Sequence, residues 1–224
     1  RIPREEDIFI HWGGSIVKTL GTVCCIVLAA FVTSGCAPPF SEMQSAKLVD
    51  EGEFEIVGHY AGVSWSDEGE SGKVQDNIGV QLAYGVAERV NLRARYEFID
   101  VGDYDITAHV IGVGPKFSLT EDVIAFYVPV GFATGEDITT EDTWQLHPTI
   151  IVTTTHSKVL EFNVSVKYIL TFAEDQDDLL AFNLGLGLSP DLSRYVIRPE
   201  AGLLLNPGED GYYWHWSIGL SIFP

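Results

Sequence analysis

From residue 53 onward, apolar and polar residues alternate along the chain with a period of two. The alternation is most regular in residues 90–98, 160–168 and 182–188. A period of two is typical of a β-strand, because successive side chains of a strand point to opposite faces. The pattern therefore predicts an all-β chain with about ten strands. We expect these strands at residues 53–65, 77–86, 90–99, 106–118, 123–133, 143–155, 159–172, 180–188, 195–205 and 212–223.

The lengths of these segments and of their connections indicate a closed sheet that crosses a membrane. Most segments have 9 to 14 residues, whereas strands of soluble proteins average about five or six and a tilted membrane-spanning strand needs about 9 to 11. Short links follow the even-numbered segments, and mostly longer, acidic links follow the odd-numbered ones. This predicts an up-and-down antiparallel transmembrane β-barrel with periplasmic turns, extracellular loops and both chain ends on the periplasmic side.

The two faces of the predicted strands differ in chemistry. One face carries small and polar residues, and the other carries aliphatic and aromatic residues almost without charge. A soluble barrel would also alternate, but its outer face would need many lysines and glutamates. We therefore place the polar face in a plugged lumen and the apolar face against lipid, with Tyr212, Trp214 and Trp216 in an interfacial aromatic girdle. The predicted lumen charge network comprises Arg93, Arg95, Glu97, Lys116, Glu161, Lys167, Arg198 and Glu200, and counting Glu53 and Glu55 gives five charges of each sign.

Two phrases, residues 112–117 (GVGPKF) and 125–131 (AFYVPVG), are typical of such strands. With the strand pattern, they resemble the small outer-membrane β-barrels of Gram-negative bacteria, the class that includes the OmpA-type domain. The resemblance implies outer-membrane localisation, contact with membrane lipid and lipopolysaccharide, and recognition by the barrel-assembly machinery. The chain departs from the class at its end, where Phe223 is followed by Pro224 rather than being terminal.

The segment before the barrel is typical of a targeting signal. Residues 20–32 form an apolar run of 13 residues, too short for a membrane-spanning helix of about 20 residues. The run is followed by Thr33-Ser34-Gly35-Cys36, which resembles the lipobox of bacterial lipoproteins. We predict a signal peptide with an upstream extension at residues 1–35, a lipidated N-terminus and periplasmic tether at 36–52, and the barrel at 53–224. Ordinary signal-peptidase cleavage nearby and a buried core helix are the alternatives.

The charge of the chain is strongly acidic and unevenly distributed. There are 13 Lys and Arg against 32 Asp and Glu, a formal net charge of −19, which excludes non-specific nucleic-acid binding. Most of the excess falls in the longer connections. Two of these connections could hold Ca²⁺ or Mg²⁺ weakly, or could simply be solvated. Their carboxylates are Glu136, Asp137, Glu141, Asp142, Glu174, Asp175, Asp177 and Asp178.

No motif points to catalysis. His59, His147 and His215 fall on the lumen-facing parity and His109 on the apolar one, but HExxH, GxSxG, P-loop and paired-cysteine motifs are missing from the sequence. We predict no enzyme and no resident cofactor. The favoured function is a structural or interaction barrel whose acidic loops bind cations or a basic partner. A narrow, porin-like, cation-preferring channel is the first alternative, and an omptin-like or lipid-modifying enzyme is the second. The sequence leaves the oligomeric state open.

Overall fold

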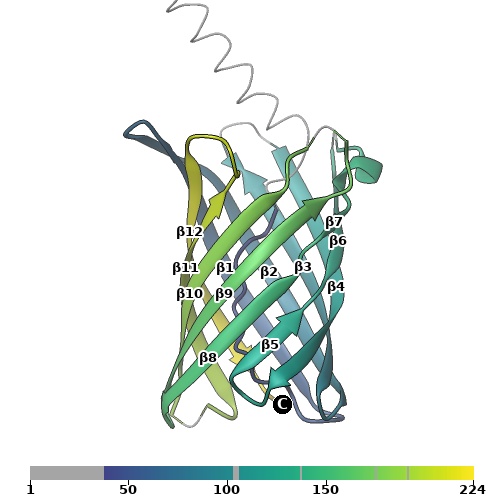
Figure 1. Ribbon diagram of the computed structural model, residues 1–224, viewed down its shortest axis with the longest axis vertical. Coiled ribbons are helices and arrows are strands. Elements are labelled where there is room, and N and C mark those ends of the chain that lie inside the picture. The colour runs from purple at the N-terminus through teal and green to yellow at the C-terminus, as the bar shows by residue number, and fades with distance from the viewer. Residues whose placement is uncertain (1–37, 103–105, 137, 175, 191) are drawn as a thin grey trace, which may run out of the picture. The chain divides into compact units, whose positions relative to one another are not determined.

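The computed structural model describes residues 38–102, 106–136, 138–174, 176–190 and 192–224, which form one compact unit. The predicted signal peptide and the lipidation site Cys36 lie outside the described residues. The described chain folds as a closed antiparallel β-barrel of ten strands (Figure 1), as the alternating pattern predicted. No helix within these ranges is long and apolar enough to cross a membrane.

The strand order follows the sequence, and each strand pairs with its sequence neighbours. Eight strands are continuous, whereas the fifth and sixth are each interrupted, at Val128-Pro129 and at His147-Pro148. Proline has no N–H to donate to a sheet, so these interruptions fall where the ladder loses donors. The elements are β1 (Phe54–Asp67), β2 (Glu70–Ala87), β3 (Val90–Val101), β4 (Ile106–Thr120), β5 (Ile124–Tyr127), β6 (Val130–Gly135), the 3₁₀ turn η2 (Thr140–Thr143), β7 (Gln145–Leu146), β8 (Thr149–Ser157), β9 (Leu160–Thr171), β10 (Leu179–Leu188), β11 (Tyr195–Leu205) and β12 (Tyr212–Ile222).

The barrel closes where its first strand meets its last. β1 pairs antiparallel with β12 over eleven positions, from Ile56 opposite Ile222 to Ser66 opposite Tyr212. Closure pairs the first strand with the last, so neither of them is an edge strand of the described sheet. The connections β2–β3, β4–β5, β8–β9 and β10–β11 lie at one end, called here the short-turn end. The connections β1–β2, β3–β4, β6–β7, β9–β10 and β11–β12 lie at the other, called here the long-loop end.

One connection differs from the prediction. Residues 66–76 were expected to form a long loop, but β1 and β2 extend into this region and stay paired as far as Asp67 opposite Glu70. The turn between them consists of Glu68 and Gly69, whose φ angles are 45° and 89°. Two-residue hairpins favour such left-handed pairs because their twist matches that of the flanking strands. The acidic composition of this segment obscured its pairing.

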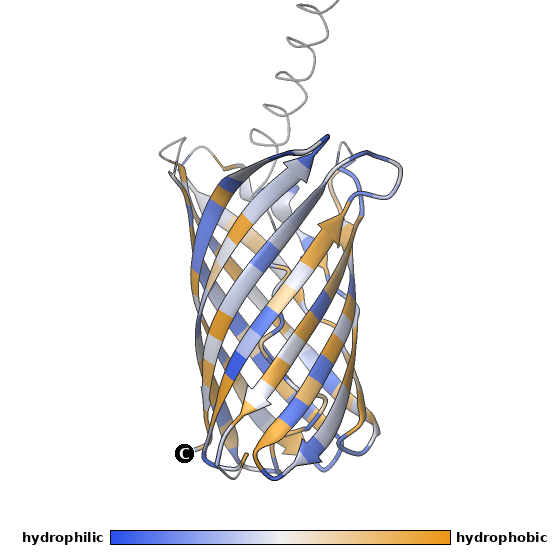
Figure 2. Cartoon of the chain, turned by 90° about the vertical axis from the view of Figure 1, so that its left-hand side faces the viewer, coloured by the Kyte–Doolittle hydropathy of each residue, from blue (hydrophilic) through white to orange (hydrophobic). Residues whose placement is uncertain are grey.

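The outside of the barrel is apolar and the inside is largely polar. Figure 2 shows hydrophobic and hydrophilic positions alternating along the strands. Large apolar side chains are exposed around the wall, including Ile78, Leu184 and Trp216 at 58, 66 and 50%. On the inner face, the side chains of Arg93 and Lys116 are almost fully buried. This arrangement is typical of a barrel with lipid outside and packed polar groups inside.

The inside of the barrel is occupied by the chain's own residues 38–49, called here the luminal segment. Figure 1 shows this segment in purple within the ring of strands. Phe40, Met43 and Ala46 are 2% exposed or less. We had expected residues 36–52 to form a tether beneath the barrel, and for residues 38–49 the structure differs. The reason is that the inner wall carries charged and amide groups that need partners, and this segment supplies them.

Candidate functional site

The luminal segment runs along the barrel from the long-loop end to the short-turn end. Phe40 packs against Ile169 and Leu204, which lie near the long-loop ends of β9 and β11. At the other end, Glu51 bridges to Gly85, close to the short-turn end of β2. Ala46 lies between these points in a lower apolar cluster with Ala125, Tyr127 and Ile151. The segment therefore traverses most of the height of the lumen before the chain turns into β1.

The inner wall binds the luminal segment mainly through its backbone. Side chains from several strands donate hydrogen bonds to six carbonyl oxygens of the segment. Because a carbonyl is the same at every residue, this mode of binding satisfies the buried backbone without requiring particular side chains. The donors and acceptors are Lys167 to Pro39 (3.1 Å), Asn183 to Phe40 (2.8 Å), Arg95 to Ser41 (2.6 Å), Gln81 to Glu42 (3.1 Å), and Lys116 to Ser45 (2.5 Å) and Lys47 (2.9 Å).

Backbone N–H groups of the segment are also satisfied by the wall. Glu200 accepts hydrogen bonds from the N–H groups of Glu42 (2.7 Å) and Met43 (3.0 Å). The hydroxyl of Thr153 accepts one from Ala46 (2.6 Å). Wall side chains thus contact the segment from both sides of the barrel and hold its irregular backbone, in which Met43 has a φ of 55°.

One side chain of the segment completes the charge balance of the lumen. The strands supply five buried or nearly buried cations but only four buried glutamates, because Glu53 is exposed rather than luminal as we had expected. Glu42 of the luminal segment is the fifth carboxylate, 2.6 Å from Lys167 Nζ. Since an unpaired buried charge costs several kcal/mol, the pairing of Lys167 depends on the segment being in place.

The remaining charges form pairs between strands. Arg93 lies 2.7 Å from Glu55, Arg198 lies 2.7 Å from Glu161, and Arg95 pairs with Glu97. Lys47 of the segment adds a contact to Glu161 at 3.1 Å. All eight side chains predicted for the lumen lie on the inner face. They are Arg93, Arg95, Glu97, Lys116, Glu161, Lys167, Arg198 and Glu200.

The histidines do not converge on one site. His59 lies 2.9 Å from Glu97, and His215 is hydrogen-bonded to Asn183 and packs edge-on against Phe40. His147 contacts Gln145, and His109 lies on the outer wall against Tyr96. In the part of the chain that the structure describes, no three His, Cys, Asp or Glu side chains are placed to share a metal ion.

The carboxylates of the two predicted cation-binding connections are dispersed. Glu136, Glu141, Asp142 and Glu174 are exposed, while Asp137 and Asp175 lie outside the described residues. Asp177 and Asp178 are engaged by protein donors: Asp177 accepts from Asn206, and Asp178 accepts from Tyr168 and from the Thr171 N–H. These two aspartates order the β9–β10 connection.

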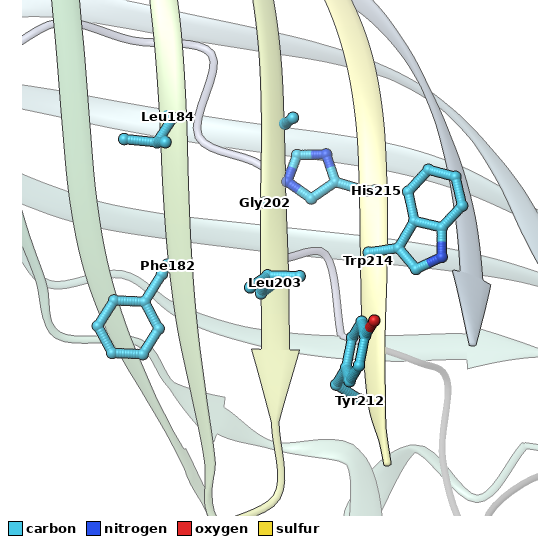
Figure 3. A pocket seen from close by; sticks show the side chains of 8 residues that line it. Phe182, Leu184, Gly202, Leu203, Tyr212, Trp214 and His215 are labelled. Atoms are coloured by element: carbon cyan, nitrogen blue, oxygen red, sulfur yellow. The ribbon is translucent and has the colours of Figure 1, made fainter. Parts of the chain in front are cut away.

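The outer wall carries a shallow groove of about 430 Å³ across β10, β11 and β12 (Figure 3). The small residues Ala201 and Gly202 leave it hollow between larger apolar neighbours. The larger neighbours are Phe182, Leu184, Leu203, Tyr212 and Trp214. Two of them, Tyr212 and Trp214, belong to the predicted aromatic girdle, so the groove opens towards lipid near the long-loop end.

Comparison with solved structures agrees with this architecture. An outer-membrane channel from Pseudomonas putida F1 matches with a TM-score of 0.51 and 10% identity, over 82% of this chain and 100% of that one. The fold is that of an outer-membrane β-barrel. The attachment invasion locus protein Ail of Yersinia pestis matches at 15% identity, TM-score 0.37, over 78% and 99% of the two chains. The translocator domain of the autotransporter NalP from Neisseria meningitidis matches at 9% identity, TM-score 0.47, over 77% and 89%.

No family model matches this outer-membrane-type barrel, and no curated protein does either. The alternation of apolar and polar residues predicted the wall of the barrel but not the luminal segment. One signal was available: Glu53 directly precedes β1 and follows Gly52, where a carboxylate reaches solvent. Without Glu53, the predicted lumen would have held five cations and only four carboxylates, so one negative charge would have been missing.

Proposed function

We propose that this chain is an outer-membrane β-barrel that does not conduct ions and has a structural or interaction function. Its acidic long-loop end would face outward and bind cations or a basic partner. The observation that carries the proposal is the occupied lumen, in which the chain's own backbone fills the path that a solute would take.

The contacts of the luminal segment oppose its displacement by a passing solute. The six bound carbonyls and three bound N–H groups lie at successive heights in the barrel. Removing the segment would leave each of these wall groups, and the charge of Lys167, to be rehydrated in a narrow space. A closed state is therefore favoured over an open pore.

The exposed charges of the two ends support an outward-facing role for the long-loop end. Exposed carboxylates at that end include Glu68, Glu136, Glu141, Asp142 and Glu209. At the short-turn end, the acidic residues are partly balanced by Arg89, Lys158 and Arg194. A concentration of one sign of charge attracts oppositely charged partners and raises their rate of association.

Planar-bilayer recording tests the closed lumen. The purified full chain is expected to give no steady conductance steps, whereas a variant that lacks residues 38–49 is expected to conduct if its heat-modifiable gel shift shows a folded barrel. Regular cation-selective steps from the full chain would contradict the proposal and favour the narrow channel.

Binding of polylysine in detergent at low salt tests the acidic end. Replacing Glu136, Glu141 and Asp142 by their amides is expected to weaken binding several-fold. The matched control replaces Glu88, Glu121 and Asp122 at the short-turn end, which removes the same charge but lies beside basic residues and is expected to weaken binding less. Equal losses would show that the acidic end is not a distinct binding surface.

A further inference from the structure

We infer that the luminal segment is threaded through the barrel with its Pro38 end opening to the solution at the long-loop end. This is opposite to the end at which β1 begins. The inference rests on the proposed outer-membrane location but not on the absence of conductance. On that location, the Pro38 end of the luminal segment faces the outer surface of the cell.

The direction of the luminal segment is fixed at several heights. Phe40 belongs to an apolar cluster with Val63, Ile169, Ala181 and Leu204, all close to the long-loop ends of their strands. The carbonyl of Lys47 is bound by Lys116, which lies towards the short-turn end of β4. Residue numbers therefore increase from the long-loop end to the short-turn end.

The luminal segment fills the space that the described wall encloses. Residues 38–46 and 49 are buried by the wall. The wall comes close to the segment at Gly219, where an added Cβ would lie 3.3 Å from Met43 Sδ. It also approaches the backbone just after the segment at Gly85, where a Cβ would lie 2.0 Å from the Asp50 carbonyl oxygen. The Pro38 end of the segment therefore lies at the long-loop opening of a lumen that the segment already occupies.

Protease accessibility in intact Gram-negative cells tests the inference. A short protease-cleavable tag is inserted between Ala37 and Pro38, and in separate variants between Glu209 and Asp210 at the long-loop end and between Glu88 and Arg89 at the short-turn end. We expect the tag at 37/38 to be cleaved as fully as the tag at 209/210, while the tag at 88/89 is cleaved only after the cells are permeabilised. Cleavage of the 37/38 tag only after permeabilisation would overturn the inference, as would equal behaviour of all three tags.

A cross-link in the untagged chain provides a test that does not depend on tolerance of an insertion. Cysteines at positions 40 and 181 are expected to form a disulfide, detected by mass spectrometry of the joined peptides, because Phe40 and Ala181 share one cluster. The matched control pairs position 40 with position 125, which belongs to the lower cluster, and is expected to give none. A disulfide from 40 to 125 but not from 40 to 181 would overturn the inference.

Discussion

Glu42 is the residue on which the charge balance of the lumen depends. It lies 2% exposed beside Lys167, and it belongs to the segment rather than to the wall. Removing one partner of a buried ion pair leaves the other charge without compensation, which costs about 3–5 kcal/mol. Stability of the barrel is therefore linked to the position of a segment that forms no strand.

The Glu42→Gln variant is expected to lower the free energy of unfolding by about 3 kcal/mol. The measurement is a urea titration of the protein in lipid vesicles, followed by the heat-modifiable gel shift. The matched control is Glu53→Gln, because Glu53 is exposed and its loss should leave the midpoint unchanged. Equal midpoints for the two variants would contradict the assignment of Glu42 to the buried network.

Gly85 of the wall lies against the backbone that follows the luminal segment. A Cβ added there would lie 2.0 Å from the backbone oxygen of Asp50, so Gly85→Ala must displace backbone. Overpacking of this kind costs about 1–3 kcal/mol, and the same titration should show it. Gly58→Ala is the matched control, since nothing lies within 4 Å of a Cβ at Gly58. A control as destabilised as Gly85→Ala would contradict the close approach.

At the level of elements, the strands were predictable because each obeys a local rule. Their side chains alternate between lipid and lumen, so the period of two persists through β3, β9 and β10. The luminal segment has no such period, because wall groups contact it on all sides. Its conformation is set by distant residues such as Lys116 and Glu200, which a local pattern does not reveal.

The β1–β2 hairpin was missed because its turn lies between acidic residues. Gly69 adopts a φ of 89°, a left-handed conformation that costs other L-residues roughly 1–2 kcal/mol. Gly69→Val is therefore expected to lower stability by about 1 kcal/mol in the same titration. Gly58→Val, at an open position without positive φ, is its control. An unchanged midpoint for Gly69→Val would argue against the two-residue turn.

At the scale of the whole molecule, the exposed aromatic side chains report where the barrel meets lipid. Trp144, Trp214 and Trp216 are 39, 37 and 50% exposed, and aromatic belts lie at the membrane interface. In vesicles, lipids brominated near the headgroup are expected to quench tryptophan fluorescence more than lipids brominated at the chain ends. Trp216→Phe should reduce the quenched fraction, and failure of either lipid to quench would contradict the bilayer position.

Closure of the wall by β1 and β12 constrains the order of assembly. The luminal segment is joined to β1 through residues 50–53, and both its ends continue into the chain. It can therefore leave the closed barrel only by being drawn lengthwise through an opening. Insertion after closure would require the preceding polypeptide to pass through a space that holds a single extended chain. The simpler sequence of events is that the segment binds the inner faces of the strands while the sheet is still open. In that case, the strands close around the luminal segment, and the pairing of β1 with β12 is the last to form.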